Sequence, residues 1–125
     1  MRSSVAVTFF EGLAAQDFGR LTSVLSDDAH LRALLPGGLK ERDGVDAIET
    51  IFTRWFGDAE AFEVVETSVD EIGPVLHMRW RVRMQAERLG RGWFAVEQQA
   101  YADRDDEGRI RRLSLICTGY CAEDA

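Results

Sequence analysis

Apolar side chains recur three or four residues apart in three stretches of the first half of the chain, which predicts three amphipathic helices. In the first stretch the apolar positions are Val5, Ala6, Phe9, Phe10, Leu13 and Ala14. In the second, shorter stretch they are Phe18, Leu21, Val24 and Leu25. In the third they are Ile48, Ile51, Phe52, Trp55 and Phe56. Asp17 and Asp43 are suitable N-caps for the second and third helices, and Gly57 is suited to end the third.

After Gly57 the pattern changes to alternation, which predicts strands. The four long segments are AFEVVETSVDEI (61–72), VLHMRWRVRMQAE (75–87), WFAVEQQAYADR (93–104) and RIRRLSLICTGY (109–120). Gly73-Pro74, LGRG and DDEG separate them and are typical of hairpin turns. LRALLPGG (31–38) predicts one further short strand, whereas SDDAH before it is expected to interrupt the second helix. The order predicts a single α+β domain over residues 1–125, with helices on the inner face of one curved, mainly antiparallel sheet.

The strand WFAVEQQAYAD (93–103) carries long polar side chains, so the face on which each lies matters for function. With Gly90-Arg91 as a two-residue turn, Trp80 pairs with Tyr101 and Met84 pairs with Glu97. A three-residue turn at 106–108 gives the same result, because it pairs Tyr101 with Leu113. Glu97, Gln99 and Tyr101 are then expected to face the helices. One extra residue in either turn reverses the assignment and turns the other set inward. That alternative set is Phe94, Val96, Gln98 and Ala100.

The inward register predicts a pocket between sheet and helices. Its expected lining is polar at two positions and otherwise apolar: Gln99, Tyr101, Trp80, Met84, Phe9, Leu13, Phe52, Trp55, Leu115 and Cys117. Glu97 is the candidate catalytic residue, because a carboxylate beside Met84 and Cys117 would be desolvated, which raises its pKa and suits general acid/base work. The alternatives for Glu97 are a position near the sheet edge or an ion pair with an arginine.

A row of outward positions on the strand from Val75 suggests an interface. Its members, Arg79, Arg81 and Arg83 with His77, alternate with an apolar set and lie beside Glu66 of the neighbouring strand. Cross-strand ion pairs explain part of this row. A homodimer interface is the sharper interpretation. His77 is expected on this surface, and His30 is a candidate pocket base if its side chain faces inward.

Charge and cysteine content exclude several classes. The chain of 125 residues has a net charge of −7 and only one lysine, Lys40. Nucleic acids and anionic membranes demand a basic face, so neither partner is expected. Cys117 and Cys121 would lie roughly 13 Å apart on one strand, too far for a disulfide. No spacing of cysteine and histidine suits zinc, so neither a metal nor a cofactor is expected. The sequence predicts a cytoplasmic protein without a membrane span.

Three segments carry a resemblance to the NTF2-like superfamily, closest to its SnoaL-like, polyketide cyclase-like branch: FFEGLAAQDFGRLTSVLSDDAHLR, ERDGVDAIETIFTRWF and YADRDDEGRIRRLSLICTGY. Gly44 to Ile48 resembles the family's Gly-x-x-x-Ile segment, and Glu107-Gly108-Arg109-Ile110 resembles its Asp-Gly-Arg-Ile hairpin. These motifs are specific for a fold and not for a function. The resemblance implies an NTF2-like cone, a curved mixed or antiparallel sheet wrapped over three N-terminal helices with an internal pocket. It also implies a homodimer formed through the convex face of the sheet.

The same resemblance speaks against isomerase chemistry. Ketosteroid isomerase-like members place a tyrosine where Phe9 lies, an aspartate near Ala33 or Leu34, and a second acid near Gln99 or Ala100. The Asp-Arg-Asp set of epoxide hydrolases of this fold is not found either. Only Glu97 could replace the pocket aspartate of the polyketide cyclases.

Three functions therefore stay open. The first is a domain that binds a small hydrophobic ligand in its cone pocket without the isomerase catalytic residues. The second is a cyclase or isomerase that acts on a polyketide-like carbonyl compound with Glu97 as general acid/base, for which Glu97→Gln should abolish turnover. The third is a dimeric interaction domain without a usable pocket.

Overall fold

The computed structural model describes residues 4–123. Three helices, a short 3₁₀ turn and seven strands follow one another along the chain. In order they are α1 (Ser4–Ala14), α2 (Phe18–Thr22), β1 (Leu25–Leu35), β2 (Gly38–Asp43), α3 (Val45–Phe56), β3 (Ala61–Ile72), β4 (Val75–Gln85), η1 (Glu87–Leu89), β5 (Phe94–Arg104), β6 (Ile110–Cys117) and β7 (Cys121–Ala122).

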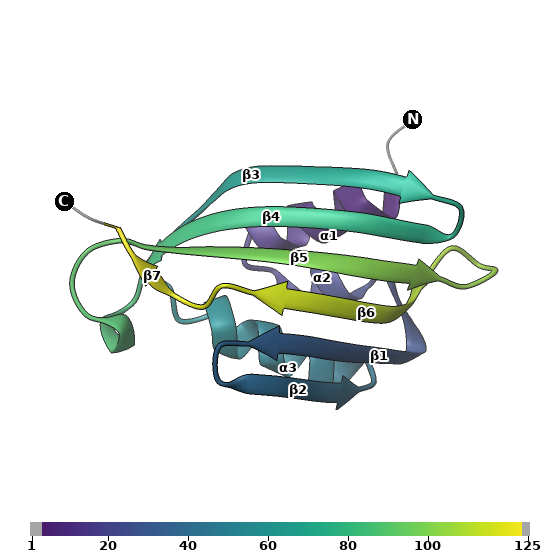
Figure 1. The fold of residues 1–125 in the computed structure, drawn as a ribbon, viewed down its shortest axis with the longest axis horizontal. Helices are drawn as coiled ribbons and strands as arrows, with labels where there is room; N and C mark the ends of the chain where they lie inside the picture. Colours follow the sequence, from purple (N-terminus) through teal and green to yellow (C-terminus); the bar gives the residue numbers. More distant parts are fainter. Residues whose placement is uncertain (1–3, 124–125) are drawn as a thin grey trace.

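The strands form one open, mixed sheet in the order β2-β1-β6-β5-β4-β3, and β7 adds to β5. Strands β1 and β6 run parallel, whereas the other neighbours are antiparallel. Figure 1 shows the three helices together on one face of this sheet. The architecture is the α+β cone that the sequence predicts, with β2 and β3 as its two edge strands.

The inner face of the sheet and the helices bury one aromatic core. Phe9 of α1, Phe52 of α3 and Trp80 of β4 are fully buried. The ring centroid of Phe9 lies 6.0 Å from that of Phe52 and 5.1 Å from that of Trp80. Large rings in edge-to-face or tilted contact stabilise a core beyond the area that they bury. The helical spacing of the apolar residues in α1 and α3 therefore places them against the concave face of the sheet.

The segment between the second and third helices differs from the expectation. SDDAH does not interrupt a helix but belongs to β1, and residues 38–43, for which no strand was predicted, form β2. From His30 to Leu34, β1 pairs with both β2 and β6, which satisfies its backbone groups there. Asp43 does not cap α3 but ends β2, and Gly44 takes the N-cap position with φ +91°.

The predicted register of β5 is wrong, and two turns explain why. The connection from β4 is longer than a two-residue turn because it contains η1, and Trp80 pairs with Gln98 instead of Tyr101. The next hairpin begins as predicted, with Arg104 opposite Ile110, but a β-bulge shifts it by one residue. Tyr101 thus pairs with Ser114 rather than Leu113.

The two shifts turn the predicted inward residues of β5 to the convex face. Tyr101 is 60% exposed, and Glu97 and Gln99 lie on the same side of the strand. The alternative set faces the helices instead, with Val96, Gln98 and Ala100 buried. A one-residue slip exchanges the two faces of a strand, since side chains alternate with a period of two.

The hairpin of β3 and β4 keeps the predicted faces of β4, whose alternating apolar residues are buried. Gly73 and Pro74 form the turn, with Ile72 opposite Val75. This turn register places Glu66 opposite Arg81, and a bulge at Val65, farther from the turn, shifts the pairing only beyond that point.

Candidate functional site

A cavity opens where the C-terminal end of α3 approaches β5 and the residues that follow β6. Its volume is about 440 Å³. The residues that line it are mainly apolar or aromatic: Leu35, Pro36, Trp55, Phe56, Val96, Gln98, Cys117, Thr118, Gly119 and Tyr120. Small-molecule sites are typically concave and apolar, with a few polar groups that orient the ligand. We call this site the Trp55–Tyr120 cavity.

Gln98 supplies the buried polar group of this cavity. Its side chain is 1% exposed, and its Oε1 accepts a hydrogen bond of 2.7 Å from the indole Nε1 of Trp80. Its Nε2 is buried and has no hydrogen-bond partner among the described residues. Buried polar groups in proteins are nearly always paired, so an unpaired amide donor beside a cavity suggests a ligand or an ordered water.

Tyr120 forms one wall of the cavity, and hydrogen bonds of its hydroxyl group hold the ring in place. Its hydroxyl donates to the carbonyl oxygen of Trp55 at 2.6 Å and accepts from Nη2 of Arg88 at 3.0 Å. The Arg88 guanidinium lies 4.8 Å from the centre of the Tyr120 ring and bonds to Asp58 at 2.6 Å. Burial raises the pKa of Tyr120, while the hydrogen bond with Arg88 opposes the rise. The hydroxyl therefore serves to position the ring.

Gly119 allows the chain after β6 to close over the cavity. Its φ is +78°, and a Cβ atom there would lie 2.8 Å from Cγ of Pro36. Both the backbone conformation and the close approach favour glycine. The amide of Gly119 also donates to Sγ of Cys117 at 3.3 Å, which fixes the turn at the cavity wall.

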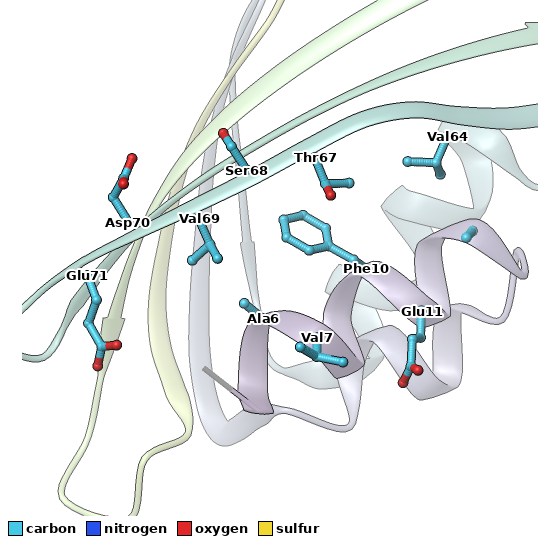
Figure 2. A pocket seen from close by; sticks show the side chains of 11 residues that line it. Ala6, Val7, Phe10, Glu11, Val64, Thr67, Ser68, Val69, Asp70 and Glu71 are labelled. Carbon is cyan, nitrogen blue, oxygen red and sulfur yellow. The ribbon is translucent and has the colours of Figure 1, made fainter. Parts of the chain in front are cut away.

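A second depression is a groove of about 950 Å³ between α1 and the edge strand β3. Figure 2 shows Phe10 directed from the helix toward the strand and Val69 directed toward the helix. The groove also carries carboxylates, but Glu11 pairs with Arg20 at 2.7 Å, and Glu71 bonds to Nη2 of Arg104. Although it is larger than the Trp55–Tyr120 cavity, this groove has a polar rim, and Gln98 does not line it.

The structure divides the predicted pocket residues into three groups. Trp55 and Cys117 line the Trp55–Tyr120 cavity. The inner residues Phe9, Leu13, Phe52, Trp80, Met84 and Leu115 are buried in the core. Gln99 and Tyr101 lie on the convex face, so their placement in an inner pocket was wrong. The sequence-based prediction missed Tyr120 and Gly119, although the Gly-Tyr pair directly after the last long strand was a usable signal.

Glu97, the candidate general acid/base, lies outside both depressions. Its Oε1 is 3.8 Å from Nε of Arg81 on the convex face, and its side chain is 31% exposed. The ion pair that was the alternative explanation is therefore the observed one. A solvated, paired carboxylate lacks the desolvation on which the catalytic role depended.

The arginine row lies on the convex face, as predicted, and is largely paired within the chain. Arg79 bonds to Glu66 at 2.6 Å, and Arg83 contacts Glu63 at 3.1 Å and Glu123 at 2.9 Å. These bonds raise the pKa of Arg83 and lower that of Glu123.

His77 lies beside this row and bonds through Nε2 to Gln99 at 3.2 Å. Its ring centroid lies 4.9 Å from that of Tyr101. The role of the row and of His77 in a dimer stays a prediction.

His30 is not a pocket base. Its Nδ1 lies 2.6 Å from Oδ1 of Asp43, and its Nε2 lies 2.9 Å from Oε1 of Glu41. These two contacts link β1 to β2. Hydrogen bonds, first that with Asp43 and then that with Glu41, raise the pKa of His30.

Within residues 4–123 no three histidine, cysteine, aspartate or glutamate side chains are placed to hold a metal ion. No helix in this range is long and apolar enough to cross a membrane.

Comparison with known proteins identifies the fold. No family model and no curated protein matches the chain. Among solved structures, a protein of Catenulispora acidiphila with a ketosteroid isomerase-like fold, in complex with trimethylamine, is 14% identical with a TM-score of 0.75. The match covers 92% of this chain and 85% of that one.

Two bacterial structures described as candidate polyketide cyclases are similar as well. The one from Xanthomonas campestris is 17% identical, with a TM-score of 0.69 over 90% of this chain and 86% of that one. The other, SnoaL-like and from Shewanella denitrificans, is 14% identical, with a TM-score of 0.68 over 90% of this chain and 87% of that one. Likeness at this identity establishes the fold and not the function. The chain therefore has the NTF2-like cone fold, which it shares with SnoaL-like and ketosteroid isomerase-like structures.

Proposed function

We propose that the protein binds a small hydrophobic molecule in the Trp55–Tyr120 cavity. The observation that carries this proposal is an apolar cavity of about 440 Å³ with aromatic walls from Trp55, Phe56 and Tyr120. Its volume lies within the range of small-molecule sites, and burying apolar surface there would drive binding. Tyr120 is held by Arg88 and by the backbone of Trp55, so the wall needs little ordering when a ligand enters.

Binding without general acid/base catalysis is favoured over a cyclase or isomerase. Among the described residues that line the cavity, Cys117 and Tyr120 are the titratable ones, and none is a carboxylate. Glu97 lies on the convex face with Arg81. The cavity also speaks against an interaction domain without a usable pocket.

Native mass spectrometry of the purified protein tests the proposal. We expect a mass above that of the chain, and a small apolar molecule in the organic extract. Cys117→Phe should fill the cavity and abolish this retention. Ala14→Phe, at an exposed position that lines the groove between α1 and β3, is the matched control and should retain the ligand. Equal loss in both variants, or no retention and no binding of added apolar probes, would overturn the proposal.

A further inference from the structure

We propose that the ligand presents a neutral hydrogen-bond acceptor, such as the carbonyl oxygen of a ketone, ester or amide, to Nε2 of Gln98. This inference rests on the proposed function, because it names the chemistry of the molecule that occupies the Trp55–Tyr120 cavity. Gln98 is then the residue that determines ligand specificity.

The orientation of the Gln98 amide follows from its partner. The indole N–H of Trp80 can only donate, so it must face the oxygen of the amide and not the nitrogen. The observed distance of 2.7 Å between Nε1 of Trp80 and Oε1 of Gln98 fits this assignment. Trp80 is fully buried, and its ring packs against those of Phe9 and Phe10, which holds the indole in place beside the amide. Gln98, which lines the cavity, therefore carries a donor whose orientation is fixed.

No group of the described chain satisfies this donor. Nε2 of Gln98 is buried and without a partner in residues 4–123. The polar groups nearby are already engaged: Oγ1 of Thr118 accepts from the amide of Glu97, and the Tyr120 hydroxyl donates to the Trp55 carbonyl. An unpaired N–H group shielded from water is unfavourable, so a ligand that supplies an acceptor gains affinity from it.

The acceptor should be neutral, because the cavity offers no positive charge. The described lining contains no lysine, arginine or histidine. Arg88 is nearby but lies against the Tyr120 ring and bonds to Asp58. An anion would lose its hydration in an apolar cavity without compensation by a cation. A carbonyl oxygen needs one donor, which is what Gln98 supplies.

Matched probes test this chemistry on the full chain. 1-Tetralone and tetralin have the same bicyclic shape and differ by one carbonyl oxygen, and 1,2,3,4-tetrahydro-1-naphthoate adds a negative charge. In ¹⁵N-labelled protein we expect 1-tetralone to bind about tenfold more tightly than tetralin, since one buried donor becomes paired. The side-chain amide signals of Gln98 should shift with 1-tetralone, and the carboxylate should bind more weakly than the ketone.

Two variants assign the preference to Gln98. Gln98→Met keeps the length of the side chain and removes the donor, so the affinities for 1-tetralone and tetralin should converge to within about twofold. Gln99→Met, on the convex face of the same strand, is the matched control and should keep the preference of the unmodified protein. The comparison of the two probes in the unmodified chain tests the inference even if Gln98→Met does not fold.

The outcomes separate this inference from the proposed function. If none of the probes shifts signals around the cavity, or if all bind in the groove between α1 and β3, both are overturned. If 1-tetralone and tetralin bind in the cavity with equal affinity, the proposed function stands and this inference fails. Persistence of the ketone preference in Gln98→Met would also overturn the role of Gln98.

Discussion

The indole nitrogen of Trp80 and the side-chain oxygen of Gln98 form a buried hydrogen bond of 2.7 Å between β4 and β5. The two residues are direct partners in the sheet, and both side chains point to the helices. This bond fixes the way in which the Gln98 amide is turned.

Removing the Trp80 donor should destabilise the protein. Trp80→Phe leaves the oxygen of Gln98 unpaired and opens a small cavity, so we expect the free energy of unfolding to fall by about 2–4 kcal/mol. Urea denaturation measures this change. Trp93→Phe is the control: Trp93 lies against Arg83 at the surface, and its loss should cost less than about 1 kcal/mol.

Combining both changes tests the bond itself. Gln98→Met should cost less in the Trp80→Phe background than in the unmodified chain, because the partner of Oε1 is already gone. Strict additivity of the two free-energy changes would contradict a coupled pair.

Gly119 should not tolerate a side chain. Gly119→Ala combines a positive φ with a contact of 2.8 Å to Pro36, so we expect a loss of more than about 1 kcal/mol in the free energy of unfolding and weaker ligand binding. Gly37→Ala is the matched control, since a Cβ atom there meets nothing within 4 Å. Equal stability of both variants would show that the turn at the cavity wall is free to move.

Glu97→Gln should leave ligand binding unchanged. The side chain lies on the convex face opposite the cavity, and its contact with Arg81 is partly solvated. We expect the free energy of unfolding to change by less than about 0.5 kcal/mol, and the dissociation constant for 1-tetralone to stay within about twofold. A tenfold weaker affinity, measured by NMR titration, would restore a role for Glu97.

His30 should make stability depend on pH. Hydrogen bonds with Asp43 and Glu41 raise the pKa of His30 in the folded state. The protonated ring therefore stabilises the fold, and its contribution to the free energy of unfolding is complete below about pH 6.5. That contribution is lost as the pH rises through the folded-state pKa. We would measure the melting temperatures of the unmodified chain and of His30→Gln between pH 5.5 and 8.5. The difference between the two melting temperatures should become smaller as the pH rises. Because Asp43 is 87% exposed, salt should weaken the effect. A constant difference across this range would exclude the linkage.

We propose that the convex face pairs with a second copy of the chain. Leu34, Leu39, Tyr101 and Ile116 are each about half exposed or more, and they surround one shallow depression on this face beside the arginine row. Exposed apolar patches often mark association surfaces. Ile116→Glu should therefore shift native mass spectra from dimer to monomer, whereas Ile72→Glu in the distant β3–β4 turn should not. A monomeric unmodified chain would refute the dimer.

The sequence by itself determined the fold class of this protein. Helical spacing placed Phe9 and Phe52 on inner helix faces, and alternation around Trp80 gave the faces of β4, because burial of apolar surface dominates wherever a pattern is long and regular. The tertiary structure decided the face of β5. A connection containing η1 and a one-residue bulge near Arg104 changed the pairing, and neither feature leaves a periodic trace in the sequence. Those two local irregularities moved Glu97 to the surface and Gln98 to the cavity, because in a strand each single-residue shift exchanges inside and outside.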